Sequence, residues 1–286
     1  MKVSAQFIRV TVAVIFLAIA LVMFAYGGLA FSLFLSVLIV LGTLELIKLC
    51  RLKGFNLNTP LILTSNLALL AAASFKLYSL IPILFSLSGI LSLVLTMLRG
   101  QNGKIADSAV SMLCFFYGGW LPLHLLFIRN LNEKGFDIFG HHFSDGLGYI
   151  LLLFVVISVS DIAAYYIGTN FGKHKLCPTI SPNKTIEGAA AATIAGIIGA
   201  LLIGSIINLN IIHSFFAGLL LTASAQLGDL CESMIKRDAG VKDSGNLFPG
   251  HGGVLDRADS YVITGAIAFY YFSMIVLGKT AIINIF

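Results

Sequence analysis

Long apolar runs separated by short polar segments follow one another along the whole chain. The first run covers residues 10–26, and the others cover residues 29–47, 58–75, 77–98, 105–128, 147–168, 187–208, 211–231 and 258–278. Most of them reach the roughly 20 apolar residues that a helix needs to cross the hydrocarbon core of a bilayer. The pattern therefore predicts an all-α polytopic membrane protein with about nine transmembrane helices.

Two boundaries in this pattern depend on single residues. Lys76 interrupts what would otherwise be one apolar run of about 40 residues, so we expect two helices there. Gly27 and Gly28 end the first run in a way that also suits the cleavage point of a signal peptide. Because no small-residue cleavage pattern is well placed and another apolar run follows at once, we expect the first helix to be retained.

The basic residues are distributed unevenly between the two sides of the membrane that nine helices define. Fourteen of the 18 Lys and Arg residues fall at the N-terminus or in the loops after the second, fourth, sixth and eighth helices. The remaining ones are Lys76, Arg129, Lys134 and Lys279. Since cytoplasmic loops carry an excess of Lys and Arg, we expect a cytoplasmic N-terminus and an external C-terminus. The same bias accounts for the net charge of +5, which therefore indicates no nucleic-acid partner.

The composition narrows the class further. Hydrophobic residues make up 58% of the chain and charged residues only 11%, with a mean hydropathy of +0.97. A soluble domain carries about 25% charged residues, so a soluble globular protein and a disordered chain are both excluded. The cysteines (Cys50, Cys114, Cys177 and Cys231) form no CxxC pair, and we expect them to be free. The adjacent His141 and His142 lack further ligands at a useful spacing and indicate a solvated external loop.

Two polar features stand out between residues 158 and 190. Asp161 lies inside an apolar run, where an acid is costly and marks either a functional site or a hydrogen bond between helices. Ser181, Lys184 and Thr185 precede the helix that opens at Glu187. A helix N-terminus with a lysine beside it can bind an anion, although a helix cap in a basic loop explains the same residues equally well.

A denser cluster of charges covers residues 228–260 and holds ten of the 31 charged residues. Asp229 ends the eighth helix on the cytoplasmic side, and Asp256 and Asp259 open the ninth on one helix face. Together with Asp161 they place four carboxylates at one depth near the inner membrane interface. Oxygen ligands of this kind suit Mg²⁺ or Mn²⁺ rather than zinc, and nearby Lys and Arg side chains suit a polyphosphate. The cluster therefore predicts a metal and phosphate site.

The segment from Ser233 to Asp259, SMIKRDAGVKDSGNLFPGHGGVLDRAD, resembles the signature of the phosphatidate cytidylyltransferases, also called CDP-diacylglycerol synthases. Residues 181–188 look like the second motif of that family, and Asp161, Tyr165 and Gly168 fit the segment before it. Three positions depart from the family pattern: Asn183 and Ile186 replace a more typical Lys and Trp, and Ala258 replaces a larger apolar residue or Thr. The missing lysine removes one phosphate contact and leaves the reaction class unchanged.

The resemblance implies that CTP and phosphatidic acid react to give CDP-diacylglycerol and pyrophosphate, with Mg²⁺ required and a second cation left open. The lipid phosphate is largely dianionic at neutral pH and can attack the α-phosphorus without a general base. The implied catalytic residues are Asp229, Asp256, Asp259, Lys236, Arg237 and His251. The implied substrate-binding residues are Ser181, Lys184, Thr185, Lys242, Asp243 and Arg257. The implied metal ligands are Asp229, Asp256, Asp259 and Asp161.

Two of these roles have alternatives. His251 either orders its loop by a hydrogen bond or contacts the leaving pyrophosphate, and Arg257 either binds substrate or pairs with a neighbouring aspartate. The resulting domain division is a group of about four N-terminal helices (1–100), a middle helix with an external loop (101–146) and a C-terminal catalytic region (147–286). The resemblance further implies a homodimer in the lipid bilayer, and the short loops suggest a multi-pass protein of a bacterial inner membrane.

Other protein classes share part of this pattern. A CTP-dependent lipid kinase would use the same residue types but would transfer the γ-phosphate. A secondary transporter for an anionic solute would account for Asp161, yet the polar residues gather at cytoplasmic helix ends rather than at the midplane, and no inverted repeat is visible. A CDP-alcohol phosphotransferase would need a DGxxAR-type motif, which the sequence lacks.

Overall fold

The computed structural model describes residues 5–247 and 252–279, and helices make up most of them. The helices are α1 (Ala5–Tyr26), α2 (Gly28–Leu52), α3 (Thr59–Ser74), α4 (Leu80–Met97), α5 (Ile105–Phe115), α6 (Leu121–Arg129), α7 (Asp145–Phe171), α8 (Ile186–Ile206), α9 (Ile211–Asp238) and α10 (Leu255–Tyr270). A 3-10 turn, η1 (Gly100–Asn102), precedes α5. The π-helical turns η2 (Phe116–Trp120) and η3 (Tyr271–Val276) join α5 to α6 and extend α10.

The predicted helical runs are all found, and α5, η2 and α6 together form the fifth of them. Among the described residues, seven helical segments are long and apolar enough to cross a membrane. The shorter apolar helices are α3, with 16 residues, and the stretch Val14–Tyr26 of α1. The predicted class, an all-α polytopic membrane protein, is therefore confirmed. Lys76 adopts φ +58° in the turn between α3 and α4, which confirms two helices at this point.

Several helices extend beyond the apolar runs that predicted them. The run 211–231 belongs to a helix that continues to Asp238, and the run 258–278 belongs to one that begins at Leu255. A helix satisfies its own backbone hydrogen bonds, so it can continue from lipid into water without an apolar side chain at every turn. At 28 residues α9 is about 42 Å long, which exceeds the roughly 30 Å of a hydrocarbon core.

Two short hairpins replace segments that the sequence indicated as loops. Strands β1 (Phe136–Ile138) and β2 (His141–Phe143) pair antiparallel between α6 and α7. Strands β3 (Lys175–Cys177) and β4 (Ser181–Thr185) pair antiparallel between α7 and α8. The sequence predicted loops at both places without strands in them, and His141 and His142 are exposed as expected.

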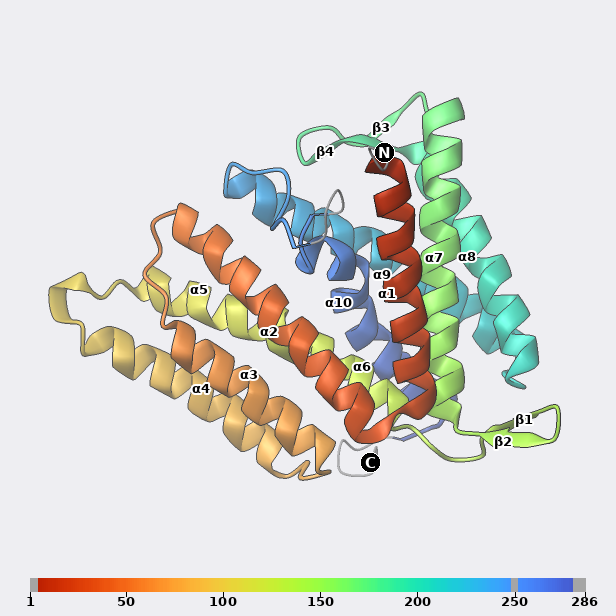
Figure 1. Ribbon diagram of the computed structural model, residues 1–286, viewed down its shortest axis with the longest axis horizontal. Coiled ribbons are helices and arrows are strands. Elements are labelled where there is room, and N and C mark those ends of the chain that lie inside the picture. The colour runs from red at the N-terminus through yellow and green to blue at the C-terminus, as the bar shows by residue number, and fades with distance from the viewer. Residues whose placement is uncertain (1–4, 248–251, 280–286) are drawn as a thin grey trace. The chain divides into compact units, whose positions relative to one another are not determined.

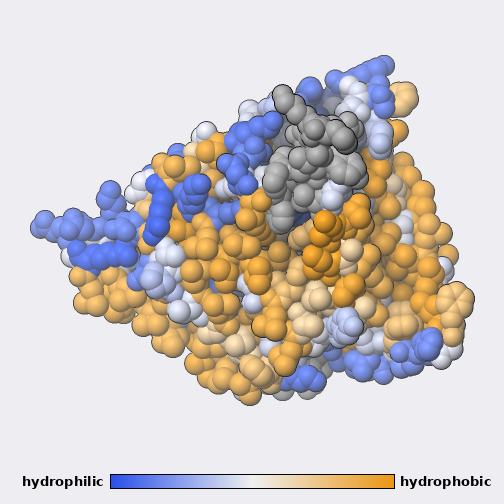
Figure 2. Space-filling view, in the orientation of Figure 1, coloured by the Kyte–Doolittle hydropathy of each residue, from blue (hydrophilic) through white to orange (hydrophobic). Residues whose placement is uncertain are grey.

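The chain divides into two compact units. The first unit comprises Met1–Leu126 and Ile235–Ala258, and the second comprises Phe127–Met234 and Asp259–Phe286. The three-part division made from sequence follows chain order and stays a prediction. Figure 2 shows that the sides of the helices are mainly hydrophobic, whereas hydrophilic residues gather at helix ends such as the turn between α4 and α5.

In the first unit, α2 packs against α3, and α4 lies antiparallel to α3 (Figure 1). The core side of α2 is closed by large side chains that are at most 2% exposed: Phe31, Leu35, Ile39, Leu46, Ile47 and Leu49. Two consecutive hydrogen bonds lie within this core. Asn66 donates to Thr43 Oγ1 at 3.0 Å, and Thr43 donates to the Gly118 carbonyl at 3.2 Å. The four cysteines are free as predicted, and buried Cys50 and Cys114 are in contact.

In the second unit, α7 and α8 pack side by side (Figure 1). Small residues allow this close approach, because a Cβ atom at Gly199 would lie 3.0 Å from Val159 Cγ2. The next helix packs in the same way, since a Cβ atom at Gly218 of α9 would lie 2.6 Å from the Cα atom of Ile197 of α8. The core of this unit is therefore built by close helix contact rather than by large side chains alone.

Candidate active site

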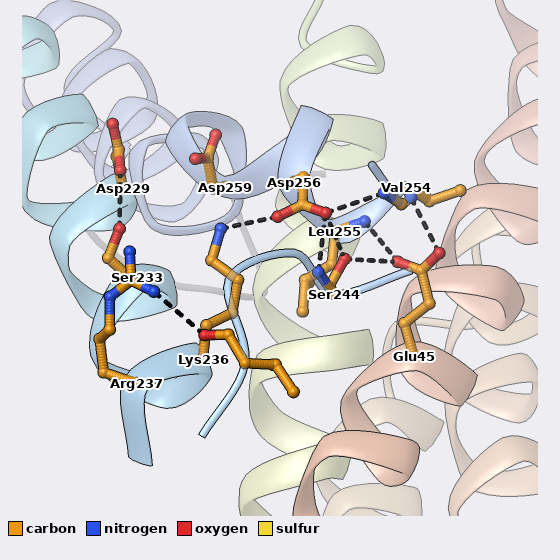
Figure 3. Close-up of polar contacts among 12 residues, drawn as sticks. Glu45, Asp229, Ser233, Lys236, Arg237, Ser244, Val254, Leu255, Asp256 and Asp259 are labelled. Carbon is orange, nitrogen blue, oxygen red and sulfur yellow. Dashed lines mark hydrogen bonds and ion pairs between the residues drawn. The ribbon is translucent and has the colours of Figure 1, made fainter. Parts of the chain in front are cut away.

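A nearly enclosed ion pair lies in the first unit, between the last turn of α9 and the first turn of α10. Lys236 Nζ donates to Asp256 Oδ1 at 2.6 Å, and the two side chains are 11% and 5% exposed. Asp256 Oδ2 accepts hydrogen bonds from Ser244 N, Ser244 Oγ and Gly253 N, each at 2.8 Å (Figure 3). Asp256 is therefore held in one orientation, with Oδ2 filled by three donors and Oδ1 turned to a cation.

The glycines before α10 are required by this arrangement. Gly252 has φ +79°, a left-handed conformation that favours glycine. A Cβ atom at Gly253 would collide with the carboxylate of Glu45. The chain can therefore pass between Glu45 and Asp256 only where it carries no side chain.

Glu45 of α2 is a site residue that the sequence prediction missed. Its Oε1 accepts from Val254 N at 3.0 Å, and its Oε2 accepts from Leu255 N at 2.8 Å and lies 3.0 Å from Ser244 Oγ (Figure 3). The signal that could have revealed it is the one that revealed Asp161, because Glu45 is also an acid inside an apolar run.

A second ion pair lies in the second unit. Lys184 of β4 lies 2.7 Å from Asp229 Oδ2 of α9, with side chains that are 25% and 34% exposed. Ser233, one helical turn further along α9, donates to Asp229 Oδ1 at 3.2 Å. The sequence prediction selected Asp229 and Lys184 separately, and the structure brings them together.

The other two predicted acids of this unit lie around Tyr261. The Tyr261 side chain is hydrogen-bonded to Ser158 and lies within electrostatic range of Asp161 and Asp259. Asp161 is exposed, whereas Asp259 is half-buried. A Cβ atom at Gly228 would lie 2.7 Å from the carbonyl oxygen of Asp259, so α9 and α10 approach closely beside Asp229.

The second motif forms the junction between β4 and α8. Thr185 caps α8 by accepting from Gly188 N at 3.1 Å, as the sequence suggested, and is buried. Glu187 accepts from Lys173 N at 3.1 Å and pairs with His174 Nδ1 at 2.6 Å, which ties the β3 hairpin to the start of α8. These contacts order the segment that carries Lys184.

The remaining predicted site residues are exposed or half-buried, apart from His251, which lies outside the described residues. Arg237 is exposed and donates to the Val241 carbonyl at 3.1 Å. Ser181 is half-buried at the start of β4. Lys242, Asp243 and Arg257 are exposed. His251 lies outside the described residues, so both of its proposed roles stay predictions.

The predicted metal ligands are divided between the two units, with Asp256 in the first and Asp161, Asp229 and Asp259 in the second. Within residues 5–247 and 252–279, no group of three or more His, Cys, Asp or Glu side chains is arranged to hold a metal ion. Asp229 and Asp256 are each paired with a lysine instead. The metal ligands therefore stay a prediction, and what the structure adds is the pairing of acid with base.

Known proteins resemble this chain over most of its length. The sequence profile of the cytidylyltransferase family matches residues 7–275. A phosphatidate cytidylyltransferase from Synechocystis is 36% identical over 284 residues, which cover 92% of this chain and 95% of that protein. One from Staphylococcus haemolyticus is 36% identical, over 89% of this chain and 94% of that protein. The chloroplastic phosphatidate cytidylyltransferase 5 from Arabidopsis thaliana is 33% identical, over 86% of this chain and 66% of that protein.

The apolar helices and the match to the cytidylyltransferase family together identify the class of this protein as a membrane-embedded nucleotidyltransferase, and its polar segments carry paired acidic and basic residues. The chain belongs to the phosphatidate cytidylyltransferase family.

Proposed function

We propose that the enzyme transfers CMP from CTP to phosphatidic acid, giving CDP-diacylglycerol and pyrophosphate for phospholipid biosynthesis. The observation that carries the proposal is the Lys236–Asp256 pair, in which a cation and a carboxylate 2.6 Å apart are nearly enclosed within the segment that resembles the family signature. The names of the relatives support the lipid substrate.

The bond changes in this reaction determine what the site has to supply. An oxygen of the lipid phosphate forms a bond to the α-phosphorus of CTP, while the bond from that phosphorus to the bridging oxygen of the β-phosphate breaks. The electron pair of the broken bond leaves with pyrophosphate. The obstacles are repulsion between two anions and the charge that grows on the leaving group, and fixed cations reduce both.

Lys236 and Lys184 are the cations that we assign to the phosphates. Lys184 directly precedes the N-terminus of α8, and a helix N-terminus favours anions. Each lysine is bound to a carboxylate, Asp256 for Lys236 and Asp229 for Lys184, so a triphosphate has to compete for the ammonium group. Further contacts to the substrates are assigned to Ser181, Thr185, Arg237, Lys242, Asp243, His251 and Arg257.

We propose Mg²⁺ as the cofactor, with a second cation left open. Mg²⁺ in phosphate-binding sites takes one or two protein carboxylates and completes its shell with water and substrate oxygens, which fits the donor set here. We assign Asp229, Asp256 and Asp259 as ligands, with Asp161 as a further ligand or a partner of these. When bound, the ion would supply positive charge to the phosphates. Support comes from Asp256 Oδ1. Among the described residues its only donor is the ammonium group of Lys236, so this oxygen already faces a positive charge.

We propose that the reaction takes place at the cytoplasmic interface of a bacterial inner membrane, with a cytoplasmic N-terminus and an external C-terminus. The length of α9 supports this location, because its last turn, which carries Lys236 and Arg237, extends past an apolar core about 30 Å thick. Water-soluble CTP can reach such a position while the acyl chains of the lipid stay in the membrane. The proposed assembly is a homodimer, which light scattering of the purified protein would measure.

The proposal is tested with purified protein, phosphatidic acid and CTP labelled at the α-phosphate, with Mg²⁺ or with EDTA. We expect label in the lipid fraction with Mg²⁺ only. The variant D256N keeps the size of the side chain and removes its charge, so it should insert and fold but lose turnover. Transfer of label from the γ-phosphate would instead indicate a lipid kinase, and unchanged turnover in D256N would refute the role of Asp256.

A further inference from the structure

We infer that Glu45 is a positioning residue of the active site, which fixes the start of α10 and thereby the orientation of Asp256. The expected effect on activity rests on the proposed function, whereas the structural part of the inference does not. The structural part concerns the hydrogen bonds that Glu45 of α2 makes with Ser244, Val254 and Leu255 in the first unit.

The first turn of a helix has N–H groups without partners inside the helix, and the residue before it normally supplies a side-chain acceptor. In α10 the preceding residue is Val254, which has no such acceptor. Glu45 instead accepts from two other N–H groups at this helix start, since its two oxygens bind Val254 N at 3.0 Å and Leu255 N at 2.8 Å separately. A negative charge at a helix N-terminus is also stabilising.

Ser244 links Glu45 to Asp256. Its hydroxyl lies 3.0 Å from Glu45 Oε2 and 2.8 Å from Asp256 Oδ2, and its backbone N–H donates to Asp256 Oδ2 at 2.8 Å. The hydroxyl has a single proton, so it donates to one carboxylate at a time. The two acids are therefore coupled through one serine, and a movement of Glu45 changes the donors that orient Asp256 (Figure 3).

The base of Glu45 is rigid. Its neighbours on α2, Leu46 and Ile47, are 0% and 2% exposed and belong to the core of the first unit. The Glu45 side chain therefore transmits the position of a packed helix to the backbone at the start of α10. This is why an acid inside an apolar run, costly in itself, is useful here.

The test uses E45Q with D107N as the matched control. Gln has nearly the shape of Glu but only one acceptor oxygen, so its amide nitrogen has to face one of the two backbone N–H groups. Asp107 is also a carboxylate of the first unit that accepts a backbone N–H, from Asn56 at 2.9 Å, and it is buried. Each variant thus removes one negative charge that holds a backbone amide, but only E45Q affects α10.

Two readouts are measured on the full chain in detergent. Hydrogen exchange of a peptide covering the start of α10 should become about tenfold faster at Val254 and Leu255 in E45Q, because a backbone hydrogen bond is lost, and should not change in D107N. The ratio kcat/KM for CTP should fall about 10- to 100-fold in E45Q, as is usual for residues that orient a ligand-binding side chain, with KM for phosphatidic acid unchanged.

Unchanged exchange at the start of α10 in folded E45Q would overturn the inference, and so would turnover equal to that of D107N. If E45Q does not fold, E45D carries the same test: it keeps both oxygens but is one methylene shorter, and wild-type exchange and turnover in it would overturn the inference. A wild-type protein without cytidylyl transfer would refute the proposed function alone, since the exchange experiment still tests Glu45.

Discussion

The Lys236–Asp256 pair makes a quantitative prediction for the variant K236M. Methionine keeps the length and the apolar stem of lysine but removes its ammonium group. Asp256 then loses the donor at Oδ1 and keeps the three donors at Oδ2, which come from Ser244 and Gly253. The loss is one charge-assisted hydrogen bond, about 1.5–3 kcal/mol of unfolding free energy. It is smaller than the roughly 3–5 kcal/mol expected when a buried ion is left unpaired.

The effect on turnover should be larger than the effect on stability. If Lys236 stabilises the charge of the phosphates, its removal should lower kcat about 10²- to 10³-fold, the usual effect of losing one such donor. A stability loss of about 2 kcal/mol cannot produce this decrease, because a protein of ordinary stability, about 5–15 kcal/mol, stays almost wholly folded. The two effects are therefore separable.

The assay is transfer of α-labelled CMP to phosphatidic acid, together with thermal unfolding in the same detergent, and K53M is the control. Lys53 also pairs with an aspartate of the first unit, Asp238, at 3.1 Å, but the side chains are 42% and 66% exposed. Such a surface pair contributes about 0–1 kcal/mol, so K53M should keep its turnover and melt close to the wild type. The reasoning is refuted if K236M turns over as fast as K53M.

Further changes test the second unit and the cofactor. The variant G228A should lose about 1–3 kcal/mol of unfolding free energy by overpacking, because its Cβ atom would lie 2.7 Å from the Asp259 carbonyl oxygen; thermal unfolding in detergent measures the loss, and wild-type stability would contradict the close contact. The variant T185A should lose the cap on Gly188 and about 1 kcal/mol of stability, measured by thermal unfolding against T193A, the same change at a half-buried position inside α8. EDTA should abolish transfer and added Mg²⁺ should restore it, and full activity in EDTA would exclude the proposed cofactor.

The helices were predictable because a bilayer requires long apolar segments, and that requirement is visible in the sequence. Their ends were less predictable, since α9 continues for about two turns beyond its apolar run. The strands could not be predicted. In β4 the sequence Ser-Pro-Asn-Lys-Thr has no alternation of apolar and polar residues, and the pair of Glu187 and His174 that flanks the hairpin is not visible from spacing along the chain.

The charged residues that the structure pairs could be selected from the sequence, but their pairing could not. Asp229, Asp256, Lys184 and Lys236 were all selected from charge and motif. The predicted partner of these carboxylates is a divalent cation, which stays a prediction, whereas in the structure Asp229 and Asp256 each lie against a lysine from another element. Spacing along a helix predicts which face a residue occupies, but it does not predict which distant segment reaches that face.

Glu45 shows why the N-terminal helices are more than a generic membrane anchor. Val254, the residue before α10, has no side-chain acceptor for the N–H groups of the first turn. The missing acceptors come from α2, 209 positions earlier in the chain than Val254. A motif of 27 residues can specify the reacting groups and still depend on a carboxylate outside it for their orientation. Substitutions that preserve the motif and change residue 45 should therefore impair the enzyme, and a transplanted C-terminal region without α2 should lack the fixed geometry of Asp256.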